Sequence, residues 1–426
     1  MASWVDYVLG PALVLGIAGL ATLSLFQQAD PLTLDPSLVL LLFDTRVLVL
    51  VATGIFGGSV LLYLYYLAGE DPSATLTGGR TVEAIVPVHK DADVMHRSVE
   101  ALLASAYEDL VVTVVCEPDD EASRDRAEEL AADDPAVSVA VNDGPSSKAA
   151  ALNTVIERST ADVIALFDAD QEPHPQLIPH AMASLEEADI ARVRSVPRPS
   201  GGLLEAVVYY EYLVLFFLPQ KLARALFGFN FAGTRSILLN ASVFDEVGTF
   251  REDTLTEDLE FSHRVLEAGV DVRELLYYPT FEEPAHSLRD WWGQRTRWMS
   301  GQVEVSTGQL RDWRRLLDRS VLGSLVTSLG TFVAGTLMVM TIPKLALGLV
   351  TSPAIVGGGL AAIVAALLAT RLVDGRTAGV EGVWAAWLLL PLAVTAYGLV
   401  IIQVVFEHAI GLESDWYSVD KVEESG

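Results

Sequence analysis

The feature that most constrains this chain is the placement of apolar residues at both ends, around a polar central block. Val8–Phe26 and Val47–Ala68 are stretches of 19 and 22 residues without a charge. About 20 apolar residues cross the roughly 30 Å of bilayer hydrocarbon. Three further apolar stretches follow Arg319, namely Val321–Pro343, Leu345–Thr370 and Val383–Phe406. We therefore predict two N-terminal and about three C-terminal transmembrane helices.

A signal peptide is the alternative for the first stretch, but no basic segment precedes it and a second span follows closely. Four arginines stand before the third predicted span: Arg311, Arg314, Arg315 and Arg319. Because positive residues accumulate on the cytoplasmic side, we predict a multi-pass plasma-membrane protein with its polar block in the cytoplasm.

The chain is strongly acidic, with 56 Asp and Glu against 28 Lys and Arg and a net charge of −28. Such a surface repels nucleic acid and anionic lipid. Concentrated salt screens the self-repulsion within a few ångströms, so the composition favours a halophilic, haloarchaeal source. A surface for a basic partner is the alternative. The single cysteine, Cys116, excludes an internal disulfide and is expected to be a buried core thiol.

Between residues 81 and 276, β-rich runs alternate with helical ones, which is typical of an α/β domain with a mostly parallel sheet and covering helices. The predicted strands are Val82–Val88, Leu110–Cys116, Val137–Val141, Val163–Phe167 and Ile190–Val196. The predicted helices are His96–Ala104, Ala122–Ala132, Lys148–Arg158 and Pro175–Ala188. We divide the chain into N-terminal spans (1–74), the α/β domain (75–310), C-terminal spans (320–406) and an acidic tail (407–426).

Two parts of the α/β domain, about 203–230 and 285–315, combine aromatic and charged residues. This density of charge predicts helices on the membrane surface rather than spans. A pair of core helices is the alternative for the first.

Two carboxylates, Asp168 and Asp170, follow an apolar run that predicts a strand. Open α/β sheets bind ligands at the carboxyl ends of their strands, and Mg²⁺ typically takes one or two carboxylates together with phosphate oxygens. The pair therefore predicts a Mg²⁺ or Mn²⁺ site for a diphosphate, with a solvated turn as the alternative.

Other polar residues follow the neighbouring strands. Pro87 and His89 end the first strand, where proline is expected to stop the ladder, and Glu117 ends the second. Lys148 begins a helix whose N-terminus favours a phosphate; it could equally be a solvated lysine. These four are candidate donor-binding residues.

Two later segments are also candidates. In Thr256-Glu257-Asp258 we expect Asp258 to act as a general base. The structural alternative expects only that the threonine caps a helix with both acids in its first turn. The segment that contains Gln294, Arg297 and Trp298 combines planar donors with aromatic faces that suit diphosphate and sugar. An interfacial anchor is the alternative for the latter segment.

Together these motifs resemble the membrane-embedded family 2 glycosyltransferases with a GT-A fold, which include cellulose, chitin and hyaluronan synthases. The similarity runs from about Thr81 to Gly301. It rests on Asp168-Ala169-Asp170, Thr256-Glu257-Asp258 and Q-x-x-R-W at Gln294, Arg297 and Trp298.

The resemblance implies nucleotide-sugar binding with the metal on Asp170 and Asp168. It also implies a catalytic site at Asp258 and Glu257, and diphosphate and acceptor contacts from the Q-x-x-R-W segment. The stretch with Gly233 and Thr234 is similar to the family's acceptor-side loop. The chain departs from the family where Glu117 replaces an aspartate pair. We expect Glu117 to meet the base, and a uridine diphosphate donor by resemblance.

The resulting hypothesis is an inverting, metal-dependent hexosyltransferase that extends a polysaccharide at the membrane. Its partners are a UDP-sugar, a saccharide or lipid-linked acceptor and the bilayer, without nucleic acid. Transfer of one sugar to a lipid-linked or glycolipid acceptor is the alternative, and an inactive scaffold or a transporter is more remote.

Overall fold

The computed structural model describes residues 44–198, 201–228, 230–254, 256–311, 335, 337–382 and 385–412. The chain divides into two compact units, one drawn mainly from Leu67–Ser200 and Asn230–Arg315 and the other from apolar helices in three parts of the sequence. The predicted span Val8–Phe26, most of Val321–Pro343 and residues 413–426 of the acidic tail lie outside the described residues.

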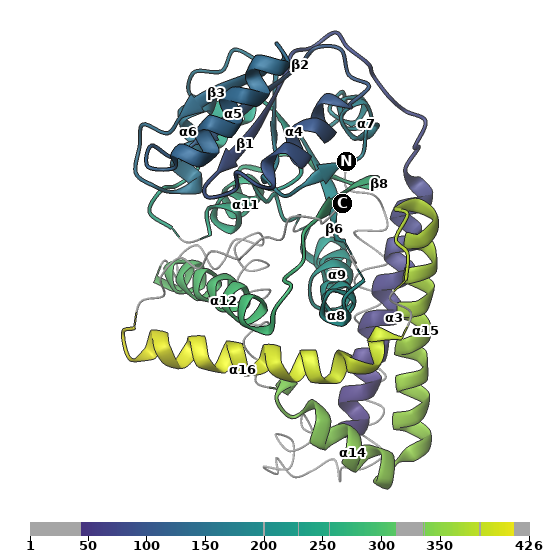
Figure 1. The fold of residues 1–426 in the computed structure, drawn as a ribbon. Coiled ribbons are helices and arrows are strands. Elements are labelled where there is room, and N and C mark those ends of the chain that lie inside the picture. The colour runs from purple at the N-terminus through teal and green to yellow at the C-terminus, as the bar shows by residue number, and fades with distance from the viewer. Residues whose placement is uncertain are drawn as a thin grey trace. The chain divides into compact units, whose positions relative to one another are not determined.

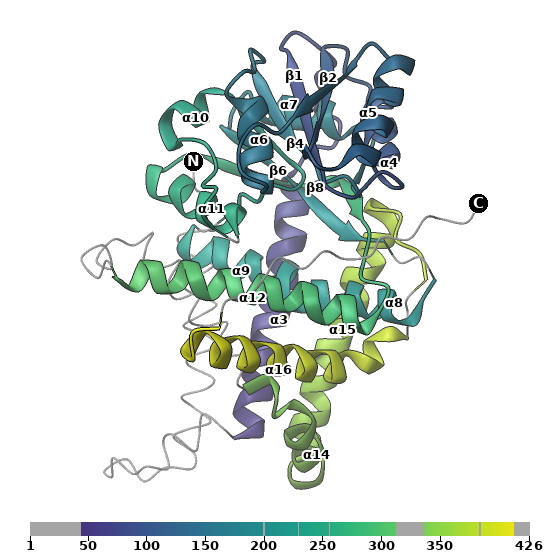
Figure 2. The same cartoon turned by 60° about the vertical axis from the view of Figure 1, so that its left-hand side comes forward.

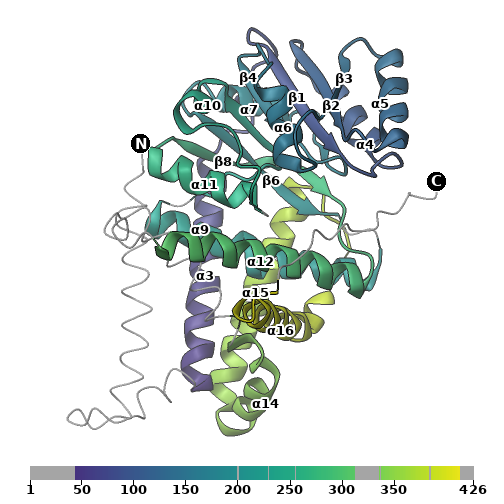
Figure 3. The ribbon, with the colours of Figure 1, turned by 90° about the vertical axis from the view of Figure 1, so that its left-hand side faces the viewer.

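The first unit is built on an eight-stranded sheet in the order β3-β2-β1-β4-β7-β6-β8-β5. Figure 3 shows β3, β2, β1 and β4 side by side. The strands are β1 Val82–Val88, β2 Leu110–Cys116, β3 Val137–Val141, β4 Val163–Leu166, β5 Glu172–Pro173, β6 Ile190–Pro197, β7 Ile237–Asn240 and β8 Val272–Glu282. Strands β7 and β5 run antiparallel to their neighbours, and the remaining pairs are parallel. The predicted mostly parallel sheet is confirmed.

Helices cover both faces of the sheet because successive strand residues point to opposite sides (Figure 1). Ala84 and Val86 face a core shared with α4 Met95–Leu103, α5 Glu121–Asp133 and α7 Leu177–Ser184. Ile85 faces the other core, which includes α6 Lys148–Ile156, α10 Ser242–Val247 and α11 Glu257–Ala268. Cys116 is buried, as predicted, and burial raises the pKa of its thiol to about 12.

The expectation for Pro87 is wrong. Pro87 pairs with Val115, and the β1–β2 ladder continues to Val88, so the proline lies inside the ladder. Only the pairing of β1 with β4 ends earlier, at Ile85. A single missing N–H leaves the hydrogen bonds of the neighbouring residues in place.

A buried ion pair ties the segment that leads into β1 to the sheet. Glu70 accepts hydrogen bonds from the backbone of Leu276 and Tyr277 in β8, at 2.8 and 3.1 Å. Its Oε1 also lies 2.9 Å from Nε2 of His180 in α7, whose Nδ1 contacts the carbonyl oxygen of Ala74.

The second unit contains long apolar helices. Four described helices are long and apolar enough to cross a membrane: Thr45–Gly69 (α3), Leu203–Leu226, Pro353–Thr377 (α15) and Ala386–Ala409. The first and last contain most of the predicted spans Val47–Ala68 and Val383–Phe406. The predicted span Leu345–Thr370 has the wrong bounds, since α14 Thr341–Thr351 ends before Pro353, which starts α15 as proline often does.

The segment Leu203–Phe227 consists of α8 Leu203–Glu211, the π-helix η1 Tyr212–Phe217 and α9 Leu218–Phe227. Its length and composition also suit a span, so the predicted surface position stays a prediction. The last helix has a 3₁₀ start, η3 Ala386–Leu389, followed by α16 Leu390–Ala409. Figure 1 shows α16 running across α3 and α15, which lie side by side.

Buried polar groups join three of these helices. Asp374 of α15 accepts hydrogen bonds from the hydroxyls of Tyr63 in α3, at 3.1 Å, and Tyr209 in α8, at 2.5 Å. Arg371, one turn earlier, donates to the carbonyl oxygen of Gly382 at 3.0 Å. Because buried charge is costly unless it is paired, these bonds fix how the helices of this unit pack.

The two buried histidines of the sheet unit predict opposite pH dependences. Burial opposes the charging of His180, but the bonds to Glu70 and Ala74 outweigh it and raise its pKa above the usual 6.5. That ion pair is complete below pH 6.5 and its stabilisation is lost as pH rises through the raised pKa. The difference in thermal midpoint between wild type and His180→Gln should therefore shrink from about pH 6 to 9.

His263 in α11 supplies the control. Burial lowers its pKa to about 4, so its contribution to stability is lost as pH falls from 6.5 toward that value. The His263→Gln difference should shrink on acidification. A His180→Gln difference that grows with rising pH would contradict the assignment.

Candidate functional site

Sheet topology brings the candidate residues to one edge. Strands β1, β2 and β4 are parallel, so their carboxyl ends lie at the same edge of the sheet. The residues that follow these ends are His89, Glu117 and Asp168. Strand β7 is antiparallel to β4, with Ile237 opposite Leu166. The loop before β7, which contains Thr234, therefore meets this edge as well.

The first acidic residue of the Asp-x-Asp segment is held by a lysine. Ser147 caps α6 by accepting from the N–H of Ala150 at 3.1 Å, and the next residue, Lys148, donates from Nζ to Oδ1 of Asp168. The N–H of Asp168 donates to Oε1 of Gln171 at 3.0 Å. The structure thus brings Lys148 and Asp168 together, which their separation of 20 residues did not reveal.

Glu117 is buried beside an amide. Asn142 donates from Nδ2 to Oε1 of Glu117 at 3.0 Å, while Oε2 is buried and makes no hydrogen bond to a described residue. Asp120 caps α5 by accepting from the N–H of Ser123 at 3.2 Å. The end of β2 thus carries one buried carboxylate with an oxygen that makes no hydrogen bond to a described residue, Glu117, and one exposed carboxylate, Asp119. Nearby, Pro87 is half-buried in β1 and His89 is exposed beyond it, and their predicted donor contacts stay predictions.

The two acids of the Thr-Glu-Asp segment have different surroundings. Glu257 is buried and its Oε1 accepts from Oγ1 of Thr234 at 3.0 Å. Burial and the neighbouring Asp258 raise the pKa of Glu257, against the effect of Lys148. Asp258 is half-buried, and its Oδ1 accepts from the N–H of Leu259 at 2.8 Å. The more accessible carboxylate is thus the one suited to meet an acceptor hydroxyl.

Thr256 stands at the N-cap position of α11, but its side chain makes no capping hydrogen bond, so that expectation is wrong. A close contact explains the difference. A Cβ atom at Gly301, in α12 Leu288–Arg311, would lie 2.1 Å from Cγ2 and 2.7 Å from Oγ1 of Thr256. The absence of a side chain at Gly301 lets α12 approach the start of α11.

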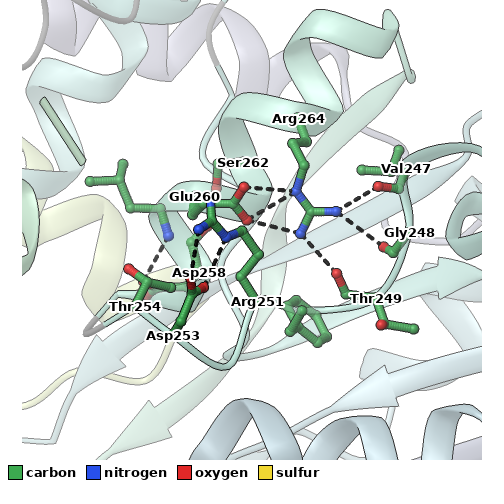
Figure 4. A network of polar contacts seen from close by, with 12 residues as sticks. Val247, Gly248, Thr249, Arg251, Asp253, Thr254, Asp258, Glu260, Ser262 and Arg264 are labelled. Carbon is green, nitrogen blue, oxygen red and sulfur yellow. Dashed lines mark hydrogen bonds and ion pairs between the residues drawn. The ribbon is translucent and has the colours of Figure 1, made fainter. Parts of the chain in front are cut away.

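Polar contacts hold the turn that leads into α11 (Figure 4). Arg264 donates to the carbonyl oxygens of Val247 and Thr249 at 2.5 and 2.8 Å, and to Glu260 at 2.9 Å. On the side of α6, Asn153 exchanges hydrogen bonds with the backbone of Phe250, at 2.8 and 3.0 Å. Helix α6, which begins with Lys148, is thereby linked to the turn before Asp258.

The Q-x-x-R-W residues lie in α12, which Figure 2 shows as the long green helix. Gln294 accepts a hydrogen bond from Arg295, whose guanidinium lies 4.4 Å from the ring centre of Trp298. Burial and, to a smaller extent, Arg235 lower the pKa of Arg297, and the carboxylates of Glu257, Asp168 and Asp258 act against them. The acids of both other motifs therefore favour the charged form of Arg297.

Two residues of the site were missed at the sequence level. Arg235 lies 3.3 Å from Oε2 of Glu282, the last residue of β8, and 5.6 Å from the ring centre of Trp298. Burial raises the pKa of Glu282, and Arg235 opposes this. Neither residue belongs to a motif. Their contact joins positions 47 residues apart, so no local pattern in the sequence indicates it.

The chemistry of the acids fits a divalent metal. No group of three or more His, Cys, Asp or Glu that could hold a metal is present within the described ranges. Asp168 and Asp170 supply the one or two carboxylates that Mg²⁺ or Mn²⁺ uses when phosphate oxygens complete its shell.

Residues 80–301, just over half of the chain, match the family described as Glycosyltransferase like family 2, and the chain belongs to this family. Family membership, the sheet order and the Asp-x-Asp segment at the sheet edge give its α/β unit the GT-A fold. The predicted membership of glycosyltransferase family 2 is thereby confirmed, and the membrane-embedded, haloarchaeal assignment stays a prediction.

Named relatives match only part of the chain. The probable glycosyltransferase YdaM of Bacillus subtilis is 24% identical over 57% of this chain and 60% of its own length. The beta-monoglucosyldiacylglycerol synthase of Trichormus variabilis is 26% identical over 36% of this chain and 33% of its own length. The matches thus cover less than two thirds of either relative.

Among solved structures, the mannosyltransferase PcManGT from Pyrobaculum calidifontis, in complex with GDP-Man and Mn²⁺, is 17% identical. It covers 84% of this chain and 99% of its own, with a TM-score of 0.47. At this TM-score the likeness adds nothing to the assignment of ligands.

The contact between α12 and α11 makes a testable prediction. Gly301→Ala should displace the start of α11 and lower glycosyl transfer about 10-fold or more, because a misplaced catalytic group is costly. Adding Thr256→Ser removes Cγ2 and should restore part of the activity. Gly357→Ala is the control, since a Cβ there meets nothing within 4 Å. Equal activity of the two glycine variants would contradict the prediction.

Proposed function

We propose that this protein transfers a glycosyl group, with inversion, from a nucleotide-diphosphate sugar to an acceptor hydroxyl at the membrane. The observation that carries the proposal is the meeting of three motifs at one sheet edge. Lys148 binds Asp168, and Thr234 binds Glu257. The guanidinium of Arg235, the residue after Thr234, lies 5.6 Å from the ring centre of Trp298 in the Q-x-x-R-W segment.

In the proposed reaction, Asp258 accepts the proton of the acceptor hydroxyl as its oxygen attacks the anomeric carbon. The bond from that carbon to the diphosphate breaks, and its electron pair leaves with the diphosphate. A divalent metal on Asp168 and Asp170 would neutralise that departing charge. Arg297 stabilises the same charge, and Lys148 holds Asp168 in place.

The donor and acceptor complete the proposal. Glu117, with one buried oxygen free of hydrogen bonds to described residues, suits an N–H of a base, and we propose a UDP-sugar. The acceptor is proposed to be a growing polysaccharide, which the Q-x-x-R-W segment favours through the family resemblance. Gly233, Thr234 and Trp298 are the proposed acceptor-side residues.

Transfer of a single sugar to a glycolipid or lipid-linked acceptor is the second candidate. It is supported by the relative named beta-monoglucosyldiacylglycerol synthase. We further propose a plasma-membrane location with the α/β unit in the cytoplasm, supported by four helices long enough to span. The net charge of −28 supports a halophilic source.

The test of the function is an assay of membranes with radiolabelled nucleotide sugars and Mg²⁺ or Mn²⁺ in high salt. Asp258→Asn should reduce incorporation about 100-fold or more, because the general base is lost. Asp253→Asn is the matched control, as Asp253 stands in the same turn, is 70% exposed and pairs with Arg251. Radiolabel in a polymer would identify a polysaccharide acceptor, and radiolabel in the lipid extract would identify a glycolipid or lipid-linked acceptor. Wild-type levels in Asp258→Asn would contradict the mechanism.

A chelator provides a second prediction. Removing divalent metal with EDTA should abolish incorporation, and Mg²⁺ or Mn²⁺ should restore it. Asp170→Asn should weaken Mn²⁺ binding, measured by electron paramagnetic resonance with UDP present, while Asp253→Asn should bind Mn²⁺ as wild type does. Full activity in EDTA would rule out the metal-dependent reaction.

A further inference from the structure

Arg235 is a cation inside the acidic site to which the proposed reaction gives no role. It directly follows Thr234, which binds Glu257, and it stands two residues before the start of β7. Its guanidinium is anchored twice, 3.3 Å from Oε2 of Glu282 and 5.6 Å from the ring centre of Trp298. Its side chain is still 33% exposed, so these two contacts do not enclose it.

The surroundings of Arg235 combine the acids of two motifs. Burial opposes its charge, but the carboxylates of Glu282, Asp168, Asp258 and Asp170 outweigh burial and raise its pKa. Arginine is charged at all physiological pH values. Arg235 is therefore a permanent cation on which the Asp-x-Asp pair and the proposed base act.

This position suits a diphosphate once a metal has neutralised the Asp-x-Asp pair. The carboxylates of Asp168 and Asp170, which also attract Arg235, would then be engaged by the metal, and the diphosphate brings new negative charge. A guanidinium presents a planar fork of donors that matches two phosphate oxygens. Glu282 and Trp298 hold that fork in advance, so little conformational entropy is lost on binding.

We propose that Arg235 binds the diphosphate of the nucleotide-sugar donor and stabilises its charge as the sugar departs. The inference rests on the proposed function. As the bond from the anomeric carbon to the diphosphate oxygen breaks, its electron pair stays on that oxygen. Arg235 donates hydrogen bonds to the diphosphate and keeps its own proton, while the proton of the acceptor passes to Asp258.

The experiment measures binding to the purified full-length protein in high salt with Mn²⁺, by isothermal titration calorimetry. Two matched pairs of probes are used, UDP with uridine and GDP with guanosine. Arg235→Gln should weaken binding of the diphosphate about 10- to 100-fold, because a charge-assisted hydrogen bond is lost, and should leave the nucleoside unchanged. Arg235→Lys keeps the charge and should recover part of the loss.

Arg198→Gln is the matched control. Arg198 also pairs with a glutamate, Glu172, lies 5.4 Å from the ring centre of Phe281 and is 32% exposed. It should bind the diphosphate within about twofold of wild type, since this pair is expected to be structural only. An equal loss in Arg198→Gln would show a general field effect and overturn the role of Arg235.

The outcomes distinguish a failure of this inference from a failure of the proposed glycosyl transfer. A wild type that neither binds a nucleoside diphosphate nor transfers a sugar contradicts the proposed function. A wild type that does both, with Arg235→Gln binding the diphosphate equally well, overturns only the inference. If Arg235→Gln loses binding of both the diphosphate and the nucleoside, the Arg235→Lys variant decides between the two explanations. Recovered diphosphate binding in Arg235→Lys supports the role of Arg235, and a failure to recover overturns it.

Discussion

The site depends on the balance between its carboxylates and three cations, Lys148, Arg235 and Arg297. Burial of a carboxylate and repulsion between like charges both disfavour the charged form, and in that order they raise the pKa of Glu257. Lys148 binds Asp168, and the acids of both motifs act on Arg235. The chain has twice as many acidic as basic residues. In such a chain these three cations offset the repulsion among the carboxylates at this edge of the sheet.

The backbone places these charges through two arrangements. The antiparallel β7 turns its preceding loop, with Thr234 and Arg235, toward the edge where β4 delivers Asp168. Gly301 then lets α12 pack against Thr256, which brings the Q-x-x-R-W helix next to Asp258. Each arrangement joins segments far apart in the chain. The functional motifs are thus spread over more than 100 residues yet meet through a few backbone contacts.

Sequence patterns predicted the parallel half of the sheet because its strands are continuous apolar runs, such as Val163–Leu166. They missed β7, where only three apolar residues precede Asn240, and β8, where Arg273 and Glu274 interrupt the apolar pattern. The motif acids were found by resemblance. Arg235 was missed because its role depends on a partner across the sheet, Glu282, and the uncapped Thr256 because its contact lies in another helix. Local patterns carry no record of such long-range contacts.

The contacts of Trp298 link the proposed donor site to the proposed acceptor site. Trp298 lies in the proposed acceptor region, and its ring faces two guanidinium groups, Arg295 at 4.4 Å and Arg235 at 5.6 Å. A cation over an aromatic face is attracted by the ring quadrupole, so the two arginines hold the orientation of the indole. Because Glu282 and Trp298 hold the guanidinium of Arg235 in advance, the ring keeps that restraint when Arg235 binds a diphosphate. The surface on which an acceptor sugar stacks would then already be ordered when the donor binds, whether that sugar belongs to a polymer or a lipid.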